Sequence, residues 1–192
     1  MKDAPDAFRE LQLLLNTKEL AGLASEPRAE REPIKSLEEK LDRIFAAEPK
    51  ILPSAQPLIC SLVLLWHDYL DESHAISQDI HDADGSFLHG IMHRREPDYG
   101  NAKYWFHRVR EHPGFPIIAE KAEKLLSGAK AIPRNAKLIQ NGDWDAFAFI
   151  DACEMALIKN DATHIALLEK VQEIEFNTLL EHFCSSSLYP TK

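Results

Sequence analysis

Apolar residues recur at helical spacing along most of the chain, and the sequence does not alternate as strands do. Residues 6–23 and 34–47 each place their apolar positions on one face, which is typical of an amphipathic helix on a core. Between them, residues 24–33 are charged and contain proline, so we expect a connector there. Glycine is scarce, at 7 of 192 residues. The sequence therefore predicts one all-α domain, a helical bundle over residues 1–192.

The longest predicted helix covers residues 54–82. It opens at Ser54 with Pro57 in its first turn, where the missing N–H of proline costs little. At about 100° per residue, polar residues form a narrow stripe opposite an apolar face. That apolar face consists of Leu58, Leu62, Leu65, Tyr69, Ile76 and Ile80. We expect this segment to be the long central helix of the bundle. The polar stripe consists of His67, Asp71, His74, Gln78 and His81.

Later helices are predicted from capping residues and apolar periodicity. Asp84, Asp98 and Asp143 each stand before such a segment, where an aspartate accepts the unpaired N–H groups of a helix start. Residues 129–142 are ambiguous, and residues 185–192 are predicted to be a loose tail. The predicted helices cover residues 85–96, 99–111, 115–126, a segment from 144 past Leu157, and 161–183.

Composition and charge narrow the class of protein. The chain carries 22 Lys and Arg against 31 Asp and Glu, a formal net charge of −9, without a basic tract. It is a poor candidate for binding nucleic acid or an anionic membrane surface. No apolar run follows the first residues as in a signal peptide, and the apolar stretch 58–66 is too short to span a bilayer. Three dispersed cysteines favour reduced thiols in a cytoplasmic protein. No oligomeric state is predicted.

The candidate chemistry lies in residues 66–104, which hold five of the nine histidines. From Ile51 through His93 there is no Lys or Arg, although acids are frequent. Arg94 and Arg95 then follow together. This distribution of charge indicates a site, although it does not define the reaction.

Two sets of side chains have the spacing i, i+4, i+7, which places them on one helix face. Imidazole and carboxylate groups in this arrangement suit a divalent metal. Because only a short turn links the two helices, we expect the sets to face each other and to bind zinc, nickel, iron or manganese. The alternative for the first set is a solvated face. The alternative for the second is imidazoles packed inside a helical hairpin and hydrogen-bonded to Tyr99, Asn101 or Tyr104. The sets are His67, Asp71 and His74, and His89, His93 and Glu96.

Two familiar metal motifs do not fit these residues. In the HExxH motif of zinc peptidases a glutamate follows the first histidine, but Gly90 follows His89. The His81-Asp82 doublet resembles that of HD-type phosphohydrolases, which need a further histidine well upstream. No histidine precedes His67, and His67 is only 14 residues ahead of His81.

Four residues of this stretch are candidates for catalysis. Arg94 and Arg95 point about 100° apart on a helix, so one of them can clamp a carboxylate or phosphate. Their alternative role is structural, in an ion pair or a helix cap. The hydroxyl of Tyr104 is available to a pocket, and His81 is a candidate for acid–base chemistry.

Residues 86–113 resemble one tetratricopeptide unit. The family pattern is W-x2-L-G-x2-Y, then A-x3-F and proline, and Gly90, Phe106 and Pro113 stand at corresponding positions here. The resemblance implies a helical hairpin whose helices approach closely at Gly90. A stacked solenoid needs about three such units, so a peptide-binding scaffold is not implied. The string HGIMHRREPDYGNAKYW is also similar to one in an uncharacterised family of microbial proteins, and that resemblance implies no activity.

Taken together, these features favour a divalent-metal-dependent, hydrolase-like enzyme that acts on a small anionic molecule in a cleft lined by His, Asp and Arg. The first alternative is a non-catalytic helical binding module in which Arg94 or Arg95 binds an anionic ligand or partner. The second is metal-free acid–base catalysis by histidine, with an arginine orienting a carboxylate substrate.

Overall fold

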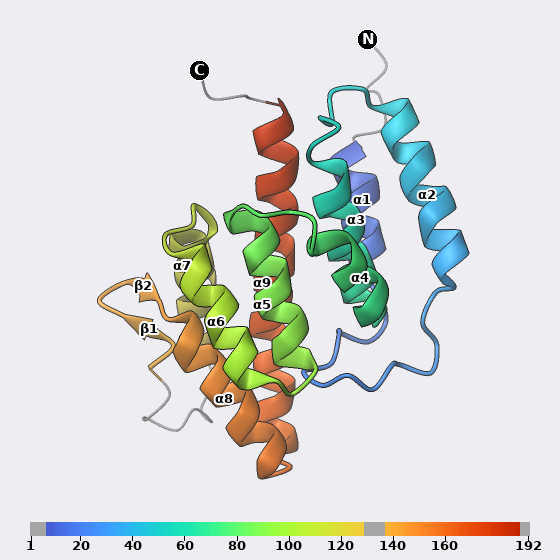
Figure 1. Cartoon of the computed structure of the whole chain (residues 1–192). Coiled ribbons are helices and arrows are strands. Elements are labelled where there is room, and N and C mark those ends of the chain that lie inside the picture. Colours follow the sequence, from blue (N-terminus) through green and yellow to red (C-terminus); the bar gives the residue numbers. More distant parts are fainter. Residues whose placement is uncertain (1–6, 129–136, 189–192) are drawn as a thin grey trace.

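The computed structural model describes residues 7–128 and 137–188. Within these residues the chain forms nine helices and one antiparallel pair of two-residue strands, which confirms the all-α prediction (Figure 1). Part of the ambiguous segment 129–142 lies outside the described residues. The helices are α1 (Ala7–Leu15), α2 (Ile34–Ala47), α3 (Gln56–Trp66), α4 (Leu70–Ser77), α5 (Ala83–Arg95), α6 (Tyr99–Val109), α7 (Gly114–Ser127), α8 (Ala146–Ile158) and α9 (Ala162–Leu188), and the strands are β1 (Ile139–Gln140) and β2 (Asp143–Trp144).

The helix α9 is the central long element of the fold. It has 27 residues and packs against α1, α3, α7 and α8. Figure 1 shows it running through the middle of the molecule, with α2 and α4 on one side and α6 and α7 on the other. Because neighbours cover it on several sides, its buried residues are not confined to one stripe. They include Leu168, Val171, Gln172, Glu175, Phe176, Thr178, Leu179, Leu180 and Phe183.

The prediction of one helix over residues 54–82 is wrong, because the chain breaks between α3 and α4. Asp68 has φ of 65°, and the N–H groups of Asp68 and Tyr69 donate to the carbonyls of Leu65 and Leu64. These two bonds form a Schellman motif, in which glycine usually takes the left-handed position. Aspartate adopts this conformation more readily than most other residues, and here its buried carboxylate also accepts hydrogen bonds from Arg28 and Arg95.

Other predicted helix boundaries shift for local reasons. The helix α1 ends at Leu15, so the connector runs over residues 16–33 rather than 24–33. At the other end of the chain, residues 185–188 belong to α9 and not to a loose tail, and residues 189–192 lie outside the described part.

Of the three predicted caps, only Asp98 is confirmed, since its carboxylate accepts the N–H of Asn101. The cap of α5 is Asp82 rather than Asp84, which lies in the first turn. The cap of α8 is Asp145 rather than Asp143, because Asp143 pairs with Gln140 in the small sheet.

The helices α5 and α6 form a close antiparallel hairpin. A Cβ atom added to Gly90 would lie 2.5 Å from the ring of Phe106, so only glycine lets α6 approach this closely. The hairpin turns over residues 96–98. As a result, the side chains of His89 and Trp105 stack across the two helices, with ring centroids 4.1 Å apart.

Candidate functional site

Arg94 and Arg95 are fully buried and have different partners. Arg94 Nη2 lies 2.6 Å from Glu175 Oε2 on α9, and Arg95 Nη2 lies 2.6 Å from Asp68 Oδ1 at the break between α3 and α4. Neither guanidinium can reach an external ligand. The hypothesis that Arg94 or Arg95 binds an anion is therefore wrong, and both residues have the structural role that was its alternative.

The break after α3 also divides the predicted stripe of polar residues. His67 is buried beside α1, where its Nε2 donates to the carbonyl of Leu14 at 2.8 Å. Asp71, in the first turn of α4, is exposed. His74 is the one member of this predicted set that reaches the imidazoles of α5, because α4 starts again in a new direction after Tyr69.

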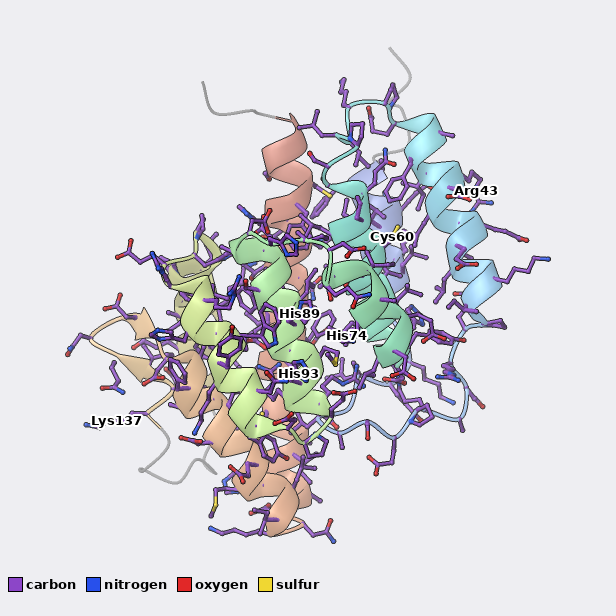
Figure 2. All side chains as sticks on the ribbon, in the orientation of Figure 1. Arg43, Cys60, His74, His89, His93 and Lys137 are labelled. Carbon is purple, nitrogen blue, oxygen red and sulfur yellow. The ribbon has the colours of Figure 1, made fainter. Side chains whose placement is uncertain are left out.

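Three imidazoles meet where α4 packs on α5 (Figure 2). The ring centroid of His74 is 5.0 Å from that of His89 and 5.7 Å from that of His93. The centroids of His89 and His93 are 6.1 Å apart. His89 and His93 are buried, and His74 is partly exposed. We refer to His74, His89 and His93 as the histidine cluster.

Hydrogen bonds fix how two of these imidazoles present their nitrogens. His89 Nδ1 lies 3.2 Å from the carbonyl of Gly85, which can only accept, so Nδ1 carries the proton. His93 Nδ1 lies 3.2 Å from the carboxylate of Glu96, and its Nε2 lies 3.1 Å from Asn101 Nδ2. The same logic assigns the proton of His93 to Nδ1. Both rings therefore carry an unprotonated Nε2.

Burial keeps these two imidazoles neutral. Burial, together with the charges of His74, His93 and Arg108, lowers the pKa of His89 to about 4, against the opposing effect of the bond to Gly85. Burial also lowers the pKa of His93, although Glu96 opposes this. A neutral imidazole with a bound Nδ1–H is the form that ligates a metal.

Aromatic and cationic side chains of α6 extend from the cluster. Trp105 stacks on His89, and the guanidinium of Arg108 lies 5.2 Å from the centre of the Trp105 ring. Tyr104 is 54% exposed and contacts the edge of Trp105, outside the cluster. Glu96 is the one predicted carboxylate that touches a cluster member.

A pocket of about 670 Å³ lies beside the cluster, where α5 begins and α6 ends. The predicted residue His81 is exposed in its wall, separate from the other predicted histidines. The wall comprises His81, Asp82, Ala83, Ser86, His107, Arg108, Val109, Arg110 and Glu111.

A second group of ionisable side chains brings together Asp84, His112 and His182. Their ligand atoms all lie within 4.8 Å of one another, and no other three such side chains in residues 7–128 and 137–185 do so. Asp84 Oδ1 lies 2.8 Å from His112 Nε2 and 3.2 Å from His182 Nε2. The sequence gives no signal for this group, because its members come from α5, the α6–α7 turn and α9.

The bonds of His112 favour a hydrogen-bonded role over a metal-bound one. Its Nδ1 accepts the N–H of Gly114 at 3.0 Å, so the ring proton is on Nε2, where it is donated to Asp84. A metal ligand normally shows the reverse, with one nitrogen on the metal and the other donating its proton. Although burial raises the pKa of Asp84, the bonds from His112 and His182 outweigh this and hold that pKa well below its usual range.

Two of the three cysteines, Cys60 and Cys153, offer little nucleophilic chemistry. Burial raises the pKa of Cys60 to about 11 and that of Cys153 to about 12. Both side chains therefore stay protonated near neutral pH, where the thiol is a poor nucleophile.

Comparisons with known protein families, with curated proteins and with solved structures find no match for this chain. None of the helices in the described ranges has the length and apolar character needed to cross a bilayer.

Proposed function

We propose that the histidine cluster binds a divalent transition metal through His74, His89 and His93, and that the protein is a metal-dependent hydrolase. The ion would be zinc, nickel, iron or manganese, all of which accept imidazole ligands. The ligand atoms on α5 would be Nε2 of His89 and Nε2 of His93. Asn101 Nδ2 lies 3.1 Å from His93 Nε2, so this amide must turn away when the metal binds.

The main support for this proposal is that Nδ1 of His89 and Nδ1 of His93 each have an acceptor for their proton. A histidine that ligates a metal almost always donates its other ring N–H to a carbonyl or a carboxylate. His89 has the carbonyl of Gly85 and His93 has the carboxylate of Glu96. Glu96 is accordingly a supporting residue in this site and not a ligand. The alternative for these residues is packed imidazoles that are hydrogen-bonded within the hairpin. The contact of His93 with Asn101 Nδ2 agrees with that alternative, and a metal titration distinguishes the two.

The separation of the rings agrees with a three-histidine site. Three imidazoles at about 2.0–2.1 Å from one zinc ion have ring centroids roughly 5 Å apart. The observed separations are 5.0, 5.7 and 6.1 Å. To bind one ion, the three imidazoles must move closer together, since their nitrogens do not all lie within 4.8 Å of one another. His74 can make this movement, because it is partly exposed on a short helix.

Three protein ligands leave a coordination position for water. A bound zinc ion lowers the pKa of such a water to about 7 and so supplies hydroxide at neutral pH. Hydrolysis of an ester, amide or phosphoester is the reaction class that this chemistry serves. The indole of Trp105 gives the site an apolar side, and hydrogen bonds hold the imidazoles of His89 and His93 in a fixed orientation.

Activity measurements test the hydrolase proposal. Protein purified without a histidine tag is stripped with EDTA, reloaded with zinc, nickel, iron or manganese, and assayed on panels of phosphoesters and carboxylic esters. We expect hydrolysis with at least one metal, none after stripping, and a loss of about 100-fold or more in His89→Gln. Substitution of His164, which lies at the start of α9, is the matched control and should leave the rate unchanged. Metal-independent hydrolysis, or equal rates in wild type and His89→Gln, contradicts the proposal.

The group of Asp84, His112 and His182 is a second candidate for the same metal chemistry. The proximity of its three ligand atoms favours it, and the N–H bond onto His112 Nδ1 opposes it. Substitution His182→Gln separates the two sites. It abolishes metal binding only if the metal lies at Asp84.

A further inference from the structure

We infer that the pocket beside the histidine cluster binds the carboxylate or phosphate group of a small molecule through Arg108 and Arg110. This deepens the proposed function, on which its catalytic meaning rests, by giving the class of substrate. Anion binding itself does not require the metal.

The pocket and the cluster lie along the same pair of helices. Ser86 of α5 and Arg108 of α6 line the pocket. His89 lies three residues after Ser86 in α5, and Trp105 lies three residues before Arg108 in α6. Because the two helices are antiparallel, both steps lead from the pocket toward the cluster. Since Arg108 stands over Trp105, and Trp105 stacks on His89, a molecule anchored at Arg108 can extend toward the cluster.

The two arginines of the pocket wall are available to an anion, although the wall also carries the negative charges of Asp82 and Glu111. Arg108 and Arg110 are exposed, and neither forms an ion pair within the described residues. Of the two acids in the wall, Asp82 is occupied as the cap of α5, where it accepts the N–H of Gly85. Glu111 is the other acid. Two available guanidiniums in one wall are the usual recognition chemistry for a carboxylate or phosphate.

The backbone of Arg110 gives an independent reason to assign it a role. Its φ is 58° and its ψ is −113°, close to the values of the first central residue of a type II′ turn. Glycine normally occupies that position, because a side chain there strains the backbone. Such strain persists at positions whose side chain is used for function. Here the strained conformation brings an arginine into the wall of the pocket.

The test is a titration with inorganic phosphate in the presence of EDTA and at constant ionic strength. Calorimetry and the shift in Tm measure binding. We expect saturable binding by wild type. Arg108→Gln and Arg110→Gly should each weaken it about tenfold or more, because each removes a charged hydrogen-bond donor. Arg110→Gly should also raise the Tm of the ligand-free protein by relieving the backbone strain. Acetate in a parallel titration distinguishes a carboxylate preference from a phosphate preference.

One matched variant makes the outcome decisive. Arg43→Gln removes one positive charge from the exposed outer helix α2, away from the pocket (Figure 2), and should bind phosphate as wild type does. Phosphate binding is measured in EDTA, so a failure of the metal proposal leaves this result unchanged. Absence of saturable binding, or equal weakening in Arg43→Gln and Arg108→Gln, overturns the inference.

Discussion

Arg95 and Asp68 form an ion pair in which both side chains are completely buried, with Arg95 Nη2 2.6 Å from Asp68 Oδ1. The second carboxylate oxygen of Asp68 accepts from Arg28 Nε at 2.8 Å. The pair therefore ties the connector and the α3–α4 break to α5. Burial alone would raise the pKa of Asp68, but the bonds from the two arginines outweigh it and hold that pKa below its usual value.

Substitution Asp68→Ala should be among the most destabilising changes in the chain. It leaves the guanidinium of Arg95 buried without its carboxylate, which typically costs about 3–5 kcal/mol in free energy of unfolding. Urea denaturation followed by circular dichroism measures this loss. Glu30→Gln is the control, because Glu30 pairs with Lys18 while both side chains are 83% exposed. It should have no measurable effect, and equal losses in the two variants would contradict the assignment.

Two glycine substitutions should have opposite signs. Gly90→Ala places a Cβ 2.5 Å from the ring of Phe106, and we expect a loss of roughly 1–3 kcal/mol from overpacking. At Gly100 the nearest atom is 3.9 Å away, so Gly100→Ala should stabilise α6 by up to about 1 kcal/mol through helix propensity. The midpoint of urea unfolding reports both. A neutral Gly90→Ala would show that α5 and α6 can separate without cost.

The hydrogen bonds from His112 and His182 to Asp84 should make the free energy of unfolding depend on pH. Because the pKa of Asp84 is lowered in the folded state, its stabilisation is complete above the unfolded value of about 3.9 and is lost as the pH falls below it. We therefore expect Asp84→Asn to be less stable than wild type at pH 7, by roughly 1–3 kcal/mol. The difference should shrink as the pH falls from about 4 to about 2. Unfolding in EDTA across this range measures it, and a constant difference contradicts the account.

The limits of prediction from sequence are clear at the α3–α4 break. Apolar periodicity continues through Asp68, because Leu65 and Tyr69 are both buried on the core side. The cause of the break is tertiary, since the partners of Asp68 are 40 and 27 residues away in the chain. Helix existence was thus predictable from local pattern, whereas this boundary was not.

For the candidate sites too, contacts that follow from local spacing were predictable, and contacts between distant elements were not. The spacing of His89 and His93 places both imidazoles on one face of α5, as the sequence predicts. His74 meets them only because the chain breaks between α3 and α4, and the pattern does not show that break. The burial of Arg94 and Arg95 could not be foreseen, because their acidic partners lie on distant elements. The contact of Asp84 with His182 has no local pattern for the same reason.

Zinc binding by the histidine cluster is the central claim, and calorimetric titration of EDTA-treated protein tests it most directly. We predict one zinc ion per chain for wild type and His182→Gln, and loss of that site in His74→Gln, His89→Gln and His93→Gln. Glu96→Gln should retain the site with about 10–100-fold weaker affinity, because Glu96 orients His93 without ligating the metal. Absence of zinc binding in wild type, or binding that His182→Gln abolishes and His89→Gln leaves intact, would contradict the claim.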